Sequence, residues 1–98
     1  MNIREVAEPI ASRQLMMGTE PVVVSIGKPE PFDDNADFFC PYSIEYAGKR
    51  KVSYAGGMDA VQALQLAIKK IGSDLAYLAK TEGVPIGWLQ DTPGETGF

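Results

Sequence analysis

One amphipathic helix constrains the fold of this chain more than any other feature. Between Asp59 and Lys80, apolar residues recur at alternating spacings of three and four, which is the period of an α-helix. A stripe of this kind must be buried against another element, and the other regular patterns in the chain are typical of strands. The sequence therefore predicts an α+β domain with one long helix across a sheet. The stripe expected to face the core consists of Val61, Leu64, Ile68, Ile71, Leu75 and Leu78.

Both ends of this helix carry recognisable signals. Asp59 is a favourable N-cap residue, and Gln62 stands three positions later, as in a capping box. Gly83 follows the last apolar turn and predicts a C-terminal stop. Gly56-Gly57 before the helix predicts a tight strand-to-helix turn, and an anion cradle is the alternative for this pair. Gly72 in mid-helix indicates close approach of another backbone.

Alternating apolar patterns upstream of the helix predict the sheet. Short turns at Gly18-Thr19 and Ala47-Gly48-Lys49 make hairpins of neighbouring strands, whereas Pro41 favours an edge position or a bulge. The expected fold is an antiparallel four-stranded meander with the helix packed across one face. Val84–Leu89 permits a short fifth C-terminal strand. The predicted strands are 11–17, 21–26, 38–46 and 50–55, within a single domain at 10–90 that lies between an N-terminal extension at 1–9 and a flexible tail at 91–98.

Composition excludes several classes of site. The 98 residues include no histidine and one cysteine, so imidazole-based catalysis, a histidine-ligated metal and an internal disulfide are all excluded. We expect no enzyme activity, no catalytic residues, no cofactor and no metal. A net charge of −4 argues against nucleic-acid binding. Neither a membrane span nor a signal peptide is recognisable, and the lone thiol suits a reducing compartment, so a cytoplasmic location is expected.

Three polar or reactive features receive structural interpretations. Cys40 shares one face of its predicted strand with Phe38, Tyr42 and Ile44, so it is expected in the core. The acidic segment 30–37 lacks the spacing of a calcium loop and is expected to be a solvated loop. Lys49, Arg50 and Lys51 crowd a hairpin tip, which predicts a solvated turn because three charges fall short of a binding stripe.

The outer face of the helix carries the candidate interface. Leu66 and Tyr77 lie about 180° from the predicted core stripe, with Lys70 and Ser73 between them. Chance exposure of apolar residues is common, and a dimer contact or a partner groove is the alternative. Trp88 is a further apolar residue that the predicted core leaves unassigned.

Three segments resemble a family of short bacterial proteins that is known only as a domain of unknown function. They are Ile26–Pro31, Phe39–Tyr42 and Tyr54–Ala67, and the last contains the distinctive Asp-Ala-Val-Gln-Ala-Leu run. The resemblance covers about residues 10 to 90. It implies a small bacterial cytoplasmic domain, and it brings no activity, cofactor or catalytic residue.

These observations favour a non-catalytic interaction module that self-associates, as a dimer. One alternative is a ligand-binding or enzymatic domain with a pocket between sheet and helix, lined by Tyr42, Tyr46 and Tyr54. The other is an immunity-like or regulatory protein that binds a basic partner through the acidic loop.

Overall fold

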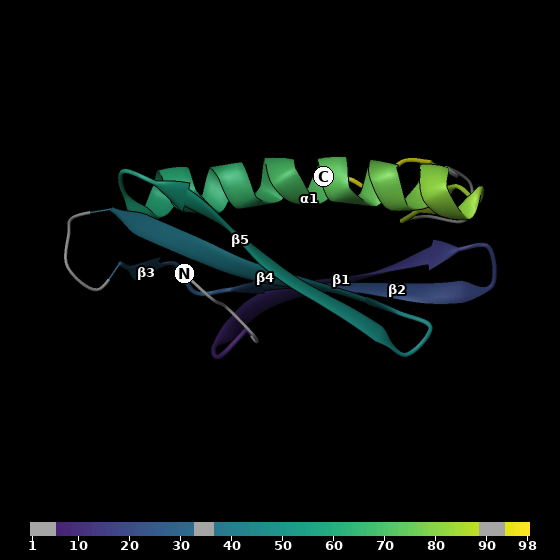
Figure 1. The fold of residues 1–98 in the computed structure, drawn as a ribbon, viewed down its shortest axis with the longest axis horizontal. Coiled ribbons are helices and arrows are strands. Elements are labelled where there is room, and N and C mark those ends of the chain that lie inside the picture. Colours follow the sequence, from purple (N-terminus) through teal and green to yellow (C-terminus); the bar gives the residue numbers. More distant parts are fainter. Residues whose placement is uncertain (1–5, 33–36, 89–93) are drawn as a thin grey trace.

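An antiparallel sheet carries one helix along one of its faces (Figure 1). The computed structural model describes residues 6–32, 37–88 and 94–98. The predicted α+β class and the antiparallel arrangement are confirmed. The elements are β1 (Pro9–Met17), β2 (Glu20–Gly27), β3 (Glu30–Pro31), β4 (Phe38–Tyr46), β5 (Lys49–Gly57), α1 (Ala60–Glu82) and β6 (Ile86–Gly87).

The four long strands follow one another as a meander, from β1 through β2 and β4 to β5. Two short strands extend it, so the sheet has six strands rather than the four or five predicted. β6 pairs with β1 at Met16 and Met17. β3 lies inside the predicted loop, where Glu30 pairs with Phe39 of β4. The sequence pattern missed β3 because two residues are too few to show alternation.

Pro41 lies in a central strand, so the predicted edge position is wrong. β4 pairs with β5 on one side and with both β2 and β3 on the other. The pairing with β2 ends at Tyr42, and the pairing with β3 begins at Phe39. Pro41 lies in the gap between these two pairings. No hydrogen bond of the sheet is lost there, although proline has no N–H to donate.

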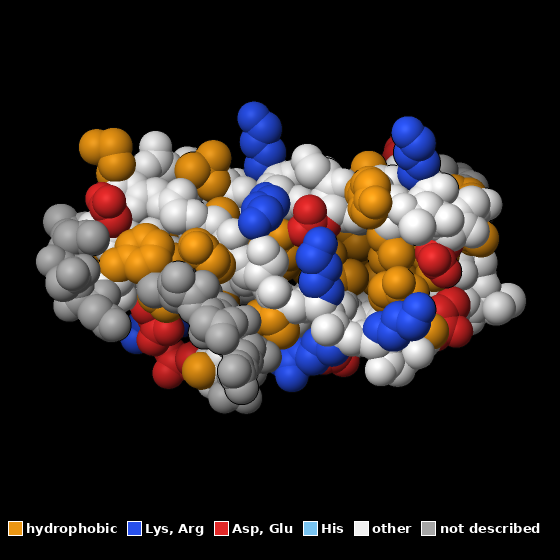
Figure 2. All heavy atoms as spheres, viewed as in Figure 1, with side chains coloured by type: hydrophobic (Ala, Val, Ile, Leu, Met, Phe, Trp, Pro, Cys, Tyr) orange, Lys and Arg blue, Asp and Glu red, His pale blue; other side chains and the backbone are white. Residues whose placement is uncertain are grey.

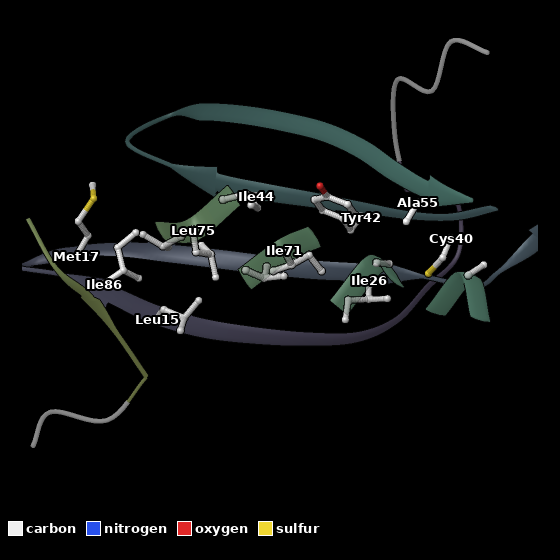
Figure 3. Close-up of a cluster of buried hydrophobic side chains, with 14 residues drawn as sticks. Leu15, Met17, Ile26, Cys40, Tyr42, Ile44, Ala55, Ile71, Leu75 and Ile86 are labelled. Carbon is white, nitrogen blue, oxygen red and sulfur yellow. The ribbon is translucent and has the colours of Figure 1, made fainter. Parts of the chain in front are cut away.

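The core lies between α1 and the sheet face that it covers (Figure 3). Alternate residues of the long strands point into it, as the period of two requires. Cys40 is fully buried there, which confirms its predicted place. The largest fully buried core side chains are Tyr42, Leu15, Ile71, Leu75, Ile86, Val22 and Val24.

The buried face of α1 is rotated relative to the predicted stripe. Ile71 and Leu75 are buried as expected, but Val61 and Ile68 are 63% and 37% exposed. The small residues Ala63 and Ala67 take their place in the core. Small side chains allow the helix to lie close to the sheet, and this close approach outweighs the larger apolar area that Val61 would have buried.

Asp59 and Gly83 cap α1 as predicted, but the Gln62 side chain bonds the residue before the N-cap instead of the N-cap itself, as a capping box would require. The Asp59 carboxylate accepts a 2.7 Å hydrogen bond from the backbone N–H of Gln62, and the Gln62 side chain accepts one from Met58 at 2.6 Å. Gly83 ends the helix in the left-handed conformation, with φ of 71°. Asp59 therefore acts as the structural cap that the sequence indicates.

Two glycines mark close backbone contacts. A methyl group built on Gly57 would lie 2.5 Å from the backbone nitrogen of Ala63, so β5 touches the first turn of α1. At Gly72 the same group would lie 3.2 Å from the carbonyl oxygen of Phe98. The predicted approach of another backbone to Gly72 is thus confirmed, and the segment that approaches is the one ending at Phe98.

Segments on either side of the predicted 10–90 domain also contact it. Val6 is buried against Gly27. Arg13 of β1 donates a 3.1 Å hydrogen bond to the carbonyl oxygen of Thr96, and its guanidinium stacks 3.9 Å from the Trp88 ring centre. Residues 91–93 of the predicted flexible tail lie outside the described residues. The predicted domain boundaries remain predictions.

Candidate binding cleft

A cleft of about 310 Å³ opens between the C-terminal half of α1 and the β4–β5 hairpin. β5 begins at the hairpin turn and ends beside the first turn of α1, and it crosses the helix at an angle (Figure 1). Strand twist of this kind separates the hairpin end from the helix. The lining residues are Ile44, Tyr46, Lys49, Arg50, Lys51, Asp74, Tyr77, Leu78 and Thr81.

The cleft combines apolar side chains with cations. Ile44 and Leu78 contribute aliphatic surface, and Tyr46 and Tyr77 contribute aromatic rings. Figure 2 shows hydrophobic side chains exposed below the right half of α1, with Lys and Arg side chains around them. This mixture suits a ligand that has both an apolar group and negative charge.

The three cations of the hairpin, Lys49, Arg50 and Lys51, differ in how far they are already paired. The Arg50 guanidinium lies 3.2 Å from the Glu45 carboxylate. The Lys49 ammonium lies 5.7 Å from the centre of the Tyr46 ring, within cation–π range. Lys51 has no ion-pair partner within the described parts of the chain. Lys51 is therefore the cation with most to gain from an incoming anion.

One carboxylate lies at the helix side of the cleft. Asp74 accepts a hydrogen bond from the hydroxyl of Tyr42, which is fully buried. Burial, together with this hydrogen bond, raises the pKa of Tyr42 far above its usual range, so the phenol keeps its proton. A carboxylate has acceptor capacity for further donors beyond one hydroxyl. The cleft thus presents cations from the strands and an acceptor from the helix.

A tight turn holds the cationic end of the hairpin. Ala47 and Gly48 both have positive φ, 50° and 75°, as a two-residue type I′ turn requires. The Glu20 carboxylate accepts a 2.8 Å hydrogen bond from the Ala47 backbone and ties the turn to β2. The three cations that follow therefore project from a braced hairpin.

The four predicted interface residues of α1, Leu66, Lys70, Ser73 and Tyr77, are all exposed. Leu66 and Tyr77 are exposed, at 40% and 71%, and Tyr77 lines the cleft. Lys70 turns toward the sheet, where its ammonium donates to the Ser53 hydroxyl at 3.0 Å and to the Tyr54 carbonyl at 2.9 Å. Ser73 bonds back to the preceding helical turn, at the Lys69 carbonyl.

Trp88 lies apart from those four residues. It follows β6, at the β1 side of the sheet, where it is 47% exposed and stacks on Arg13. The candidate interface of the sequence is therefore divided between two regions of the molecule.

The three tyrosines of the alternative pocket are separated. Tyr42 is buried in the core, and Tyr46 alone of the three lines the cleft. Tyr54 makes edge-to-face contacts with Phe32 and Phe39, whose ring centres lie 6.4 and 6.2 Å away. The β4–β5 register explains this, because Tyr54 pairs with Pro41, whose side chain points away from that of its neighbour Tyr42.

Two other sequence features offer little to a ligand. Burial raises the pKa of the Cys40 thiol to about 11, which keeps it protonated and unreactive near neutrality. Residues 33–36 of the acidic loop lie outside the described residues. Within the ranges that the structure describes, no group of three or more acidic or cysteine side chains could hold a metal ion.

The sequence reasoning missed the cleft because it considered the hairpin cations alone. The run Lys49–Lys51 predicts a solvated turn, and nothing in the sequence pattern indicates that Tyr77 and Leu78 lie opposite it. The one sequence feature that indicates this cleft is the length of the predicted helix. α1 is long enough to pass the whole of β5, so its last turns must face the hairpin end of the sheet.

A comparison with known protein families identifies the family of the chain. A family model described as a domain of unknown function, DUF6968, matches residues 11–98. No curated protein and no solved structure matches the chain significantly. Within the described residues, no helix is long and apolar enough to cross a membrane. The match covers most of the sequence and agrees with the resemblance noted from its motifs. The chain belongs to the DUF6968 family, a domain of unknown function.

Proposed function

We propose that this domain is a non-catalytic interaction module whose cleft binds an acidic segment of a partner protein. The observation that supports this most directly is the juxtaposition of Lys49 and Lys51, which lack ion-pair partners in the described structure, with the apolar lining of the cleft. Charge complementarity favours an anionic ligand, and the apolar lining favours one that also carries an aliphatic or aromatic side chain.

The net charge of the whole chain affects how an acidic ligand would bind. The net charge is −4, so a general electrostatic field would repel acidic partners. Three consecutive cations on a braced hairpin reverse that field locally. Binding to this cleft should therefore depend on short-range contacts and weaken with added salt.

The test uses one defined probe, an acetylated and amidated octapeptide whose odd positions alternate glutamate with valine and phenylalanine and whose even positions are threonine, so that one face of the extended peptide carries both acidic and apolar side chains. Calorimetry should detect its binding to the wild-type chain, and Lys51→Glu should weaken binding by about tenfold or more, the equivalent of about 1.4 kcal/mol. Lys69→Glu is the matched control, because Lys69 makes the same charge change on an exposed helix position outside the cleft.

A second peptide, with lysine in place of glutamate, controls for the charge of the ligand. It should not bind measurably. Equal weakening by Lys51→Glu and Lys69→Glu would show a diffuse charge effect, and that result contradicts the proposed site.

Self-association is a second candidate function, and apolar residues exposed on the sheet outside the contact with α1 favour it. α1 covers one face, whereas Val23, Ser25 and Val52 on the other face remain half-buried, and Ile10 and Met16 are 53% and 37% exposed. A second copy could cover this face. Light scattering at micromolar and higher concentration distinguishes the two states, and a monomer throughout would defeat this candidate.

A further inference from the structure

We infer that the acidic segment binds as an added strand, pairing with the outer edge of β5 at Arg50 and Val52. This inference rests on the proposed function, since it states how the ligand of the same cleft is held. Strand addition supplies affinity through main-chain hydrogen bonds, while neighbouring pockets select side chains.

The geometry of the β4–β5 hairpin shows which backbone groups are available. The two-residue turn closes on the pair Tyr46–Lys49. In such a hairpin the closing pair is hydrogen-bonded, and hydrogen-bonded pairs then alternate along the strands. Lys49, Lys51 and Ser53 therefore direct their N–H and C=O groups toward β4. Arg50 and Val52 direct theirs outward.

The contact made by Lys70 supports this assignment independently. Its ammonium donates to the carbonyl oxygen of Tyr54, the next outward-facing residue in the same alternation. β5 pairs with β4 and with no other strand in the described parts of the chain. Among the described residues, no strand and no side chain bonds to the outward backbone groups of Arg50 and Val52.

The two ends of the open edge limit the length of an added strand. Lys70 closes it at Tyr54, and the type I′ turn closes it before Lys49. A strand in this place pairs over about four residues, which is short for a strand but sufficient for a peptide ligand.

This position also explains why apolar and acidic groups are needed together. Side chains of an added strand alternate between the two faces of the sheet. Those on the helix side would enter the cleft beside Tyr77 and Leu78, within reach of Lys51. The opposite edge of the sheet is less suitable, since β6 already pairs with Met16 and Met17 of β1 and that strand starts with Pro9 and a register shift.

The test changes the ligand, so it does not depend on the folding of a variant. Two versions of the glutamate octapeptide carry N-methyl groups on alternate amides, one on the odd and one on the even positions. A strand uses one edge to pair with β5, so one version should lose binding by about tenfold or more while the other binds like the unmodified peptide.

A protein variant provides the complementary measurement. Val52→Pro removes an outward N–H without touching the ladder to β4, and Val52→Thr keeps that N–H as its matched control. Val52→Pro should weaken the unmodified peptide by about tenfold relative to Val52→Thr.

The outcomes separate the inference from the function on which it rests. Equal affinities of the two N-methylated peptides would overturn strand addition. If the unmodified peptide still discriminated Lys51→Glu from Lys69→Glu in that case, the acidic-ligand cleft would stand. Failure of the unmodified peptide to bind the wild-type chain would overturn both.

Discussion

At the scale of single residues, the glycines show where the fold leaves no space. Gly56 and Gly57 are adjacent in the sequence, and neither has a positive φ in the structure. A methyl group on Gly56 would make ordinary contacts, the nearest at 3.8 Å from the Phe38 carbonyl. On Gly57 it would collide with the backbone of Ala63. The sequence predicts a tight turn for the pair, but only the packing of α1 on β5 shows which glycine is required.

The first prediction compares these two positions. Gly57→Ala should destabilise the protein by about 2 kcal/mol, since the collision is with helix backbone that can move only by shifting α1. The melting temperature should fall by roughly 10 °C for a domain of this size. Gly56→Ala should lower it by a few degrees at most. Thermal unfolding followed by circular dichroism measures both, and similar melting temperatures for the two variants would contradict the close contact.

At the scale of elements, hydrogen-bonding signals proved more reliable than apolar spacing. Asp59 and Gly83 cap α1 as the sequence indicates, because a cap depends on neighbours along the chain. The face that α1 buries depends on the surface beneath it. The sheet approaches so closely at Gly57 that Ala63 and Ala67 face it, and Val61 is left exposed. The spacing of apolar residues in the sequence does not indicate how closely the helix approaches the sheet.

The second prediction concerns the contact between α1 and the segment that ends at Phe98. Gly72→Leu should lower the melting temperature by several degrees. The added side chain must displace the Phe98 backbone, and this cost exceeds the gain of about 1 kcal/mol in helix propensity. Ala76→Leu is the control, at an exposed position one turn further along the helix. A melting temperature for Gly72→Leu that equals or exceeds the wild-type value would refute the contact.

At the scale of the whole molecule, the cleft arises from the relation between two elements that the sequence describes separately. The hairpin cations and the apolar end of α1 were each recognisable as patterns. The cleft between them forms because the sheet twists. The end of β5 at Gly57 lies against α1, whereas the hairpin end lies further from the helix. The tyrosines show the opposite case. Tyr42, Tyr46 and Tyr54 are close in sequence, yet strand alternation and register separate them.

The position of the bound peptide tests the central claim most directly. In a titration of the ¹⁵N-labelled chain with the glutamate octapeptide, we expect the largest amide shifts at 49–52 on β5 and at 74–81 on α1. Shifts at Trp88 and in 94–98 should be small, and Lys51→Glu should suppress the response. Perturbations centred on Trp88 and 94–98, or an unchanged spectrum at millimolar peptide, would contradict the claim that the cleft between α1 and the β4–β5 hairpin binds acidic segments.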